Sequence, residues 1–291
     1  MRFKADLTLF LVALLWGSAF VAQRVAGQVG SVYFFNAARF LLGAALLLPF
    51  ARRRFAFSKP QALWMLAGGA VLFIASALQQ AGIRYTTAGN AGFITSLYVV
   101  LVPLILLAGW RERPHWLVFV GLMLAILGAF LLSTGGKLHL QPGDGLEFAG
   151  SFFWALHVVI LGKFAKHYDP LSFSLGQFVV AGLLNFLAGL FLEQFGLIDL
   201  EVVLGAVIYT AIVSIGLGYT LQVWAQRHTP PTDAALILSL ESVFAVLSGW
   251  LFLGEGLVWI QIAGCLLILS GVVLAQIRLP REIKVNIPEV A

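Results

Sequence analysis

Residues 78–103 read LQQAGIRYTTAGNAGFITSLYVVLVP, and residues 221–246 read LQVWAQRHTPPTDAALILSLESVFAV. The two stretches align without a gap at a constant offset of 143 residues. Apolar residues match easily by chance, so the shared polar residues are the more informative ones. The identical pairs include Gln79/Gln222, Arg84/Arg227, Thr86/Thr229, Ala91/Ala234, Ile94/Ile237, Ser96/Ser239 and Leu97/Leu240. The chain therefore contains an internal repeat.

The repeat extends beyond these stretches in both directions. The same offset gives the pairs Glu112/Glu255, Trp116/Trp259, Gly121/Gly264, Leu124/Leu267 and Gly128/Gly271. Nearer the N-terminus the match is weaker, at an offset of 138 that places Trp16 on Trp154. We therefore expect two units, residues 7–133 and 145–277, followed by a tail at 278–291.

The composition shows what surrounds these units. Of the 291 residues, 60% are hydrophobic and 11% are charged, and the mean hydropathy is +0.96. Soluble domains carry roughly 25% charged residues, so this chain has too few charges to cover a water-facing surface. The net charge of +5 lies in short loops between apolar runs, which indicates membrane orientation rather than nucleic-acid binding. Cys265 is the single cysteine, which excludes a disulfide framework.

Ten apolar stretches are about as long as a transmembrane helix, which needs roughly 20 residues. They are separated by charge clusters or Gly/Pro turns and cover residues 7–25, 32–50, 62–82, 89–109, 115–133, 145–163, 171–192, 201–222, 232–253 and 257–277. We predict an all-α integral membrane protein with ten transmembrane helices in two five-helix repeats. Because five is odd, the second repeat enters the membrane from the opposite side, so the repeats are inverted.

The positions of lysine and arginine predict the orientation. With the N-terminus inside, three basic residues (Arg24, Arg84 and Lys137) lie outside, and Arg39 lies within a span. The other fourteen lie on the cytoplasmic side: Arg2, Lys4, Arg52, Arg53, Arg54, Lys59, Arg111, Arg113, Lys163, Lys166, Arg227, Arg278, Arg281 and Lys284. The positive-inside rule then predicts a multi-pass protein of a bacterial-type plasma membrane with both termini in the cytoplasm.

Inverted repeats are typical of secondary transporters, in which a site near the membrane midplane is exposed alternately to either side. Other classes remain as alternatives: a non-transporting scaffold or receptor, a channel, and a membrane-embedded enzyme. The sequence has no HExxH motif, paired Cys/His spacing or GxxxxGK[ST] loop. We therefore expect no catalysis, metal or cofactor, and transport driven by a gradient or by the substrate's own concentration difference.

Short motifs add a family resemblance. They are LWGSAF at 15–20, YTTAGNA at 85–91, LGE at 253–255, and Gln261-x-x-Gly264 running on to Gly271. Over nearly the whole chain they resemble EamA-type members of the drug/metabolite transporter superfamily. The resemblance implies ten helices in two inverted five-helix units and movement of small polar or amphipathic metabolites, such as amino acids or related compounds, often as export. The superfamily also handles amines, nucleotide sugars, phosphorylated sugars and cofactors, so the resemblance does not fix the substrate.

Glu241 is the first candidate site residue, because it lies near the centre of the predicted span 232–253. A charged residue at that depth costs about 2.5–3.5 kcal/mol on insertion scales, and such residues are functional by default. Glu241 could contact a substrate amine or carry a coupling proton; alternatively, it forms a buried ion pair that only locks two helices. Its repeat counterpart is Tyr98, which places a second polar group at a similar depth.

Arg39 and His157 are the next candidates. The planar guanidinium of Arg39 suits a substrate carboxylate or phosphate; alternatively, it pairs with Glu241 or snorkels to the outer interface. If Arg39 and Glu241 pair, substrate or a proton could compete for the bridge. His157 could relay protons, since imidazole titrates near neutral pH, or it could be a hydrogen-bonded packing residue.

Aromatic and amide side chains complete the predicted cavity. Trp16 and Trp154 could stack on a substrate, or they could belong to interfacial aromatic belts. Gln79, Gln80 and Gln222 could hydrogen-bond a polar substrate, or they could join neighbouring helices. The expected partners are a small-molecule substrate, the lipid bilayer and protons as coupling ion, without nucleic acid.

Overall fold

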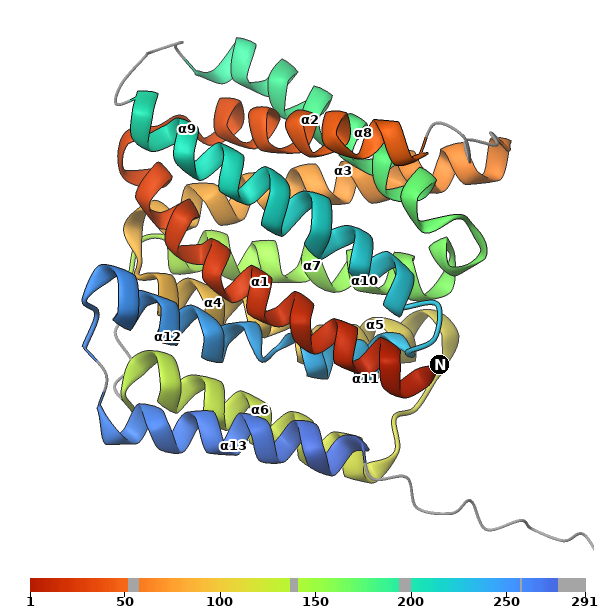
Figure 1. Cartoon of the computed structure of the whole chain (residues 1–291). Coiled ribbons are helices and arrows are strands. Elements are labelled where there is room, and N and C mark those ends of the chain that lie inside the picture. Colours follow the sequence, from red (N-terminus) through yellow and green to blue (C-terminus); the bar gives the residue numbers. More distant parts are fainter. Residues whose placement is uncertain (52–57, 137–140, 194–199, 257, 277–291) are drawn as a thin grey trace, which may run out of the picture.

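A computed structural model describes residues 1–51, 58–136, 141–193, 200–256 and 258–276. Within these ranges every regular element is a helix (Figure 1). The predicted orientation rests in part on Arg52-Arg53-Arg54, Lys137 and the tail 278–291, which lie outside the described residues.

The elements follow one another in a simple order. They are α1 (Arg2–Val29), α2 (Val32–Ala51), α3 (Lys59–Gly82), η1 (Ile83–Tyr85), α4 (Ala88–Ser96), α5 (Tyr98–Trp110), α6 (Trp116–Thr134), α7 (Asp144–Lys163), η2 (Ala165–His167), α8 (Pro170–Leu192), α9 (Leu200–Tyr209), η3 (Thr210–Tyr219), α10 (Thr220–Ala225), α11 (Pro231–Leu238), α12 (Glu241–Leu253) and α13 (Trp259–Gln276). In the described part of the chain, eight helical segments are long and apolar enough to cross a membrane, and α6 and α13 are shorter apolar helices.

Local sequence signals explain where several helices begin. The Ser58 hydroxyl accepts a hydrogen bond from the Gln61 backbone N–H at the start of α3, and Thr87 does the same for Asn90 at the start of α4. Such side chains satisfy backbone N–H groups that have no partner within the helix. At the other end of a helix, Gly135 follows α6 with a φ of +60°, a conformation that glycine adopts without strain.

Two predicted spans, 89–109 and 232–253, are not continuous helices. Each is interrupted near its middle, between α4 and α5 and between α11 and α12. At both breaks the backbone tightens into i→i+3 hydrogen bonds, such as that from the Leu240 N–H to the Ile237 carbonyl (3.2 Å). Irregular backbone at membrane depth is tolerated where protein or a cavity surrounds it. The second half-helices begin at Tyr98 and Glu241, which the repeat aligns with each other.

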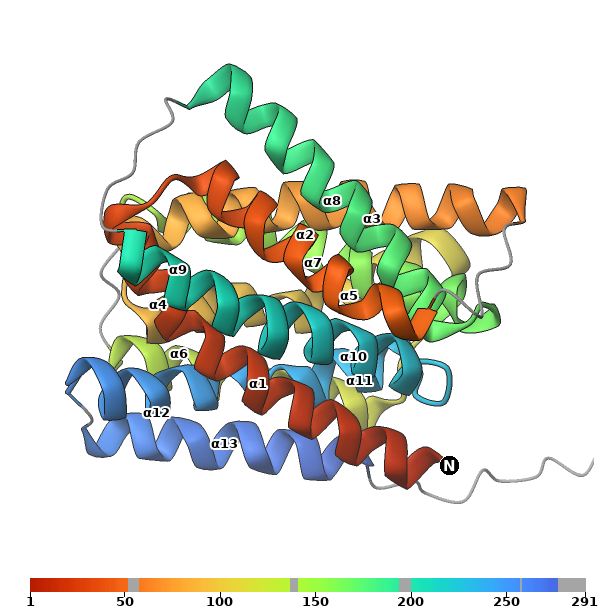
Figure 2. The ribbon, with the colours of Figure 1, turned by 45° about the horizontal axis from the view of Figure 1, so that its top comes forward.

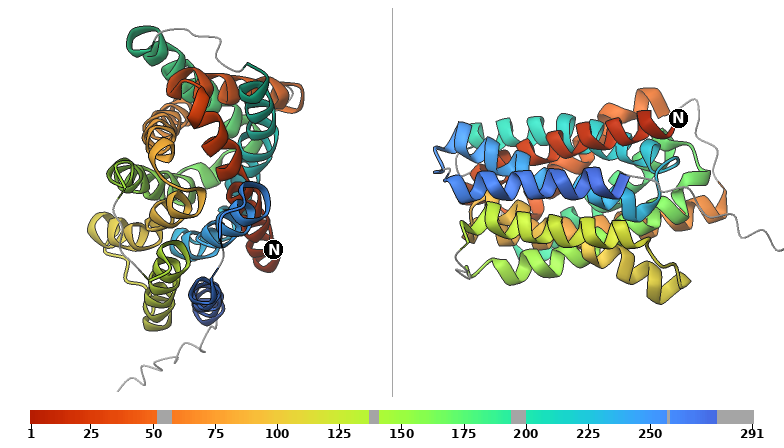
Figure 3. Two further views of the ribbon diagram at one scale, coloured as in Figure 1. Left: turned by 90° about the vertical axis from the view of Figure 1, so that its left-hand side faces the viewer. Right: turned by 90° about the horizontal axis from the view of Figure 1, so that it is seen from below.

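The helices form a bundle with a distinct pair at each end. Figures 1 and 3 show α6 and α13 side by side at one end, and α2 packs on α8 at the other. Figure 2 shows α8 crossing α2 and α3. Between these pairs lie α1, α3 and α7, together with the interrupted helices α4–α5 and α11–α12. Large apolar side chains such as Phe119, Phe186 and Leu190 are exposed, as expected for a surface covered by lipid.

Glycines allow α6 and α13 to approach closely. Gly128 of α6 lies against Gly264 of α13, and Gly121 lies against Gly271. A Cβ placed on Gly128 would be 2.6 Å from the Gly264 carbonyl oxygen and 2.8 Å from the Ile268 nitrogen. Small residues at such contacts let the backbones of membrane helices pack directly.

We predict that Gly128→Val lowers the unfolding temperature in detergent, because the helices must separate to admit the side chain. Overpacking of this kind costs about 1–3 kcal/mol. Scanning fluorimetry measures the change. The matched control is Gly109→Ala in α5, where no atom lies within 4 Å of an added Cβ. Equal unfolding temperatures for wild type and Gly128→Val would contradict the close contact.

Candidate functional site

A small cavity of about 30 Å³ lies between the helices, with walls from both halves of the chain. The structure brings eight of the nine predicted site residues to this cavity: Trp16, Arg39, Gln79, Tyr98, Trp154, His157, Gln222 and Glu241. The ninth, Gln80, does not line it. Its amide instead donates to the Gln23 carbonyl oxygen (3.0 Å) and joins α3 to α1, which is the packing alternative.

Glu241 and Tyr98 occupy the breaks in the two interrupted helices. Each is the first residue of a half-helix, and their side chains are 3% and 2% exposed. The N-terminus of a helix carries partial positive charge, which favours a nearby anion. The Tyr98 hydroxyl lies near enough to interact electrostatically with the Glu241 carboxyl group. Neither that hydroxyl nor Oε1 of Glu241 completes a hydrogen bond with another described residue.

Arg39 is held on the other side of the cavity by amide oxygens. Its Nε donates to Asn36 (2.9 Å) and its guanidinium also donates to Gln23 (2.9 Å). The pairing of Arg39 with Glu241, which the sequence left as one alternative, is not formed in this structure, because the guanidinium is directed to the two amides. The snorkelling alternative is wrong as well, since Arg39 is only 3% exposed and lines the central cavity.

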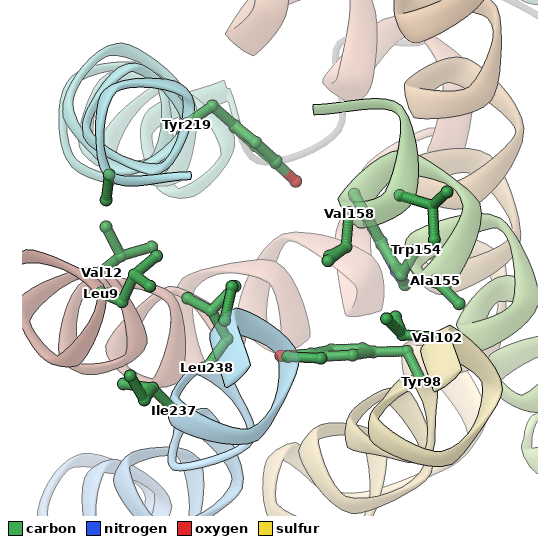
Figure 4. Packing of buried hydrophobic residues seen from close by; sticks show 14 of the residues in the cluster. Leu9, Val12, Tyr98, Val102, Trp154, Ala155, Val158, Tyr219, Ile237 and Leu238 are labelled. Carbon is green, nitrogen blue, oxygen red and sulfur yellow. The ribbon is translucent and has the colours of Figure 1, made fainter. Parts of the chain in front are cut away.

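Tyr219 connects the charged and aromatic parts of the cavity. Its ring centroid lies 4.8 Å from that of Trp16, 6.1 Å from Trp154 and 5.7 Å from His157. It also interacts electrostatically with both Arg39 and Glu241. Figure 4 shows Tyr219 and Tyr98 extending from different helices toward the space beside Trp154. Both tryptophans face this cavity and not a membrane interface, so the aromatic-belt alternative is wrong.

The remaining polar side chains differ in how well they are paired. His157 shares a hydrogen bond of 2.9 Å with Gln177, and Gln79 donates to the Thr95 hydroxyl (3.0 Å). Gln222 is fully buried, and neither its amide nitrogen nor its amide oxygen has a described partner. The indole N–H of Trp154 is also without one.

The chemistry of these groups suits a small polar molecule. An unsatisfied buried polar group costs about 1–3 kcal/mol, so the unpaired atoms of Trp154 and Gln222 favour a ligand that hydrogen-bonds to them. The guanidinium and the carboxyl group suit opposite charges, and the rings suit an apolar or cationic part. Among the described residues no group of three or more His, Cys, Asp or Glu could hold a metal ion.

Sequence reasoning missed several residues of the site. Tyr219 and Ser214 lie in η3, a π-helical segment inside the predicted span 201–222; the Ser214 carbonyl accepts from the Trp16 indole (3.2 Å). Tyr219 could have been found from the sequence, because it is a tyrosine inside an apolar span. Glu147, next to the cavity, was also missed, although an acidic residue inside the predicted span 145–163 indicates function by default.

Comparison with known proteins gives the family. The model of the EamA-like transporter family matches residues 3–134 and again residues 141–276. The chain belongs to the EamA-like transporter family. An uncharacterized transporter of Archaeoglobus fulgidus is 34% identical to this EamA-family chain over 281 residues, covering 95% of this chain and 87% of the other.

Two further comparisons extend over nearly the whole EamA-family chain. The threonine/homoserine exporter RhtA of Escherichia coli (strain K12) is 27% identical and covers 96% of this chain and 92% of its own. A solved crystal structure is 18% identical, covers 95% of this chain and 97% of its own, and has a TM-score of 0.77, which shows the same fold.

The family and its transporter relatives confirm the coarse predictions. This EamA-family protein is a multi-pass, all-helical membrane transporter of a small-molecule substrate, not an enzyme.

We predict that Tyr219→Leu lowers the unfolding temperature of this EamA-family transporter more than Tyr219→Phe does. The phenylalanine keeps the ring contacts, whereas leucine removes aromatic pairs worth about 0.5–1.5 kcal/mol each. Phe191→Leu is the control, because Phe191 is 84% exposed. Tyr219 would not be the centre of the cluster if its replacement by leucine destabilised the protein no more than this control.

Proposed function

We propose that this EamA-family transporter exports amino acids or related small polar or amphipathic metabolites by alternating access. The observation that supports this most directly is the central cavity, in which Arg39, Glu241 and aromatic rings from both halves face one buried space. The likeness to the threonine/homoserine exporter RhtA over 96% of the chain supports the substrate class and the direction.

An α-amino acid matches the charges of this cavity. Arginine has five N–H donors, and Arg39 uses one Nε and one terminal nitrogen on Asn36 and Gln23. The guanidinium therefore keeps donors for a substrate carboxylate. The substrate ammonium group would bind Glu241, and Tyr219 would contact the rest of the molecule. A proton that competes with the ammonium group for Glu241 would couple transport to the proton gradient.

We propose that the chain has ten transmembrane helices in two inverted five-helix units, 7–133 and 145–277, with α6 and α13 as the last helix of each unit. The two family matches support this arrangement, as do the two helix breaks at repeat-aligned positions. The glycine contacts between α6 and α13 also fit. The repeat offset converts the Gly121–Gly271 contact into the Gly128–Gly264 contact.

One polar contact between the units would close the cytoplasmic face. The Thr229 hydroxyl donates to Oδ1 of Asp6 (2.8 Å), which ties the start of α11 to the start of α1. Arg2 strengthens the contact by donating to Asp6 (2.8 Å) and to Asp233 (2.6 Å).

The repeat-equivalent contact would close the outer face. Asp144 is the counterpart of Asp6 at the offset of 138, and Asn90 is the counterpart of Asp233 at the offset of 143. The Asn90 amide donates to Asp144 (2.8 Å) and to Thr86 (2.7 Å), which ties the start of α4 to the start of α7. Because both contacts are formed, we assign the structure to an occluded state, from which either contact opens in turn.

For orientation, we predict that both termini lie in the cytoplasm of a bacterial-type plasma membrane. In a Cys265→Ser background, a cysteine at exposed Gln141 should react with a membrane-impermeant maleimide in intact cells. A cysteine at exposed Arg113 should react only after permeabilisation. The reverse pattern would invert the orientation, and labelling of both in intact cells would contradict the topology.

For transport, we predict that the purified protein moves radiolabelled threonine or homoserine in proteoliposomes and that a pH gradient accelerates this flux. Glu241→Gln should abolish the pH dependence, because the amide cannot bind the coupling proton. Arg39→Lys should weaken substrate binding about tenfold or more, because lysine cannot reproduce the planar fork.

Glu112→Gln serves as the control, since Glu112 lies at the surface and pairs with Lys163. If the flux of the Glu241→Gln variant depends on the pH gradient as that of the wild type does, Glu241 has a structural role and does not carry the coupling proton. If the wild type moves none of a wider pool of amino acids, amines and nucleotides, the scaffold or receptor alternative gains support.

A further inference from the structure

Glu147 is a buried carboxyl group that the proposed binding of substrate does not use. It lies in the first turns of α7 and is 0% exposed. Its Oε2 accepts a hydrogen bond from the Thr95 hydroxyl (3.2 Å), whereas Oε1 has no described hydrogen-bond partner. A carboxylate in a membrane-spanning helix is costly without a partner, so its presence calls for an explanation.

Thr95 links Glu147 to the central cavity. Thr95 and Gln79 both line that cavity, and the Gln79 amide donates to the same Thr95 hydroxyl (3.0 Å) that donates to Glu147. A single hydroxyl therefore separates the Glu147 carboxyl group from the cavity that contains Glu241.

In the other direction Glu147 approaches the end of the bundle. Asp144 begins α7 three residues earlier, which places it next to Glu147 on one face of the helix, and it is partly exposed. The Asp144 carboxylate forms the contact with Asn90 that would close the outer face. Asp144, Glu147 and Thr95 thus form a polar series from this face to the cavity.

The repeat shows that packing does not require this polar series. At the offset of 138 the counterpart of Glu147 is Leu9, and at the offset of 143 the counterpart of Thr95 is Leu238. Both leucines are 0% exposed. Figure 4 shows Leu9 and Val12 of α1 beside Leu238 of α11, in one apolar cluster. The repeat-equivalent contacts therefore differ: the contact between α1 and α11 is apolar, whereas the contact between α7 and α4 is polar.

No cation on the helices packed around Glu147 neutralises it. The helices in contact with α7 are α3, α4, α5 and α11, with η2 at its end. Apart from Glu147, the ionisable residues of these elements and of α7 itself are Lys59, Tyr98, Asp144, His157, Lys163, Lys166, His167 and Asp233.

The lysines among them lie at, or just beyond, the ends of α3 and α7 that are farthest from Glu147. Lys59 begins α3, whereas Gly82 at the end of α3 is the residue next to Glu147. Lys163 ends α7, and η2 follows it. Arg84 follows α3, and its Cγ lies beside Gly27 of α1. Glu147 thus faces Thr95, Gln79, Gly82 and the like charge of Asp144.

We propose that Glu147 is a second proton-binding carboxyl group, through which protons pass between the membrane face at Asp144 and Glu241 in the cavity. This proposal rests on the proton-coupled transport proposed above. The Thr95 O–H, which donates to Glu147 in the structure, turns toward the cavity when Glu147 is protonated. Glu147 then gives its proton to the Thr95 oxygen while the Thr95 hydroxyl gives its own proton to a water molecule in the cavity, and this water passes a proton to the Glu241 carboxylate. When the transfer is complete, Glu147 is a carboxylate and Glu241 is a carboxylic acid, so one proton has moved and no other group has changed.

Infrared difference spectroscopy at stepped pH tests proton binding without any substrate. Wild type should show carbonyl bands of two buried carboxylic acids, of which Glu147→Gln removes one and Glu241→Gln removes the other. Ser151→Ala is the control, because Ser151 is a buried polar residue one turn further along α7. Identical pH-dependent bands in wild type and Glu147→Gln would overturn the proposal.

Proteoliposome flux separates proton passage from a structural role. With threonine and homoserine as probes, Glu147→Gln should reduce net flux driven by a pH gradient by about tenfold or more, as expected for loss of a positioned proton-transfer group. Exchange at equal substrate concentrations needs no net proton movement and should remain at the wild-type rate. Equal loss of both activities would assign Glu147 to structure.

Two further outcomes are distinguishable. If wild type exchanges neither probe, the proposed function fails for them, and the infrared titration still decides whether Glu147 binds a proton. If Glu147→Gln does not fold, Thr95→Val keeps the carboxyl group and removes its hydrogen bond. This variant should then shift the Glu147 band and slow net flux driven by a pH gradient more than it slows exchange, whereas an unchanged band and an unchanged ratio of net flux to exchange would overturn the proposal.

Discussion

The cost of placing polar groups inside hydrocarbon is the constraint on which the rest of this structure depends. Helices satisfy their own backbone, but a break in a helix does not, and a break therefore needs protein or a cavity around it. Both breaks in this chain lie at the bundle centre and place Tyr98 and Glu241 there. Interrupted helix ends and charged side chains thus gather in one buried space because the lipid-facing surface cannot hold them.

Much of the architecture and most of the site could be predicted from the sequence. Apolar length marks the membrane-spanning stretches, and intramembrane charge marks Arg39 and Glu241. The repeat alignment added Tyr98 to the candidate site residues as the counterpart of Glu241, although Tyr98 carries no charge. These signals succeed because each reflects a cost that the bilayer imposes on a single residue or a single stretch.

The rest depends on contacts between distant segments. Whether Arg39 pairs with Glu241 or with Gln23 is decided by how α1, α2 and α12 are placed around the cavity, which no local pattern encodes. Gln80 and Gln79 are neighbours in sequence, yet one bonds to the α1 backbone and the other faces the cavity. The helix breaks were missed because the mean hydropathy of Ala88–Trp110 (2.3) and of Pro231–Leu253 (2.0) is as high as that of the other long spans.

The difference between the Leu9–Leu238 contact and the Glu147–Thr95 contact makes the two membrane faces of the molecule unequal. A carrier built from two identical inverted halves would look the same from both sides of the membrane, and its two faces would bind substrate with equal apparent affinity. Gradients still set the direction of net movement. Unequal halves, however, allow loading on one side and unloading on the other to have different rates and different pH responses.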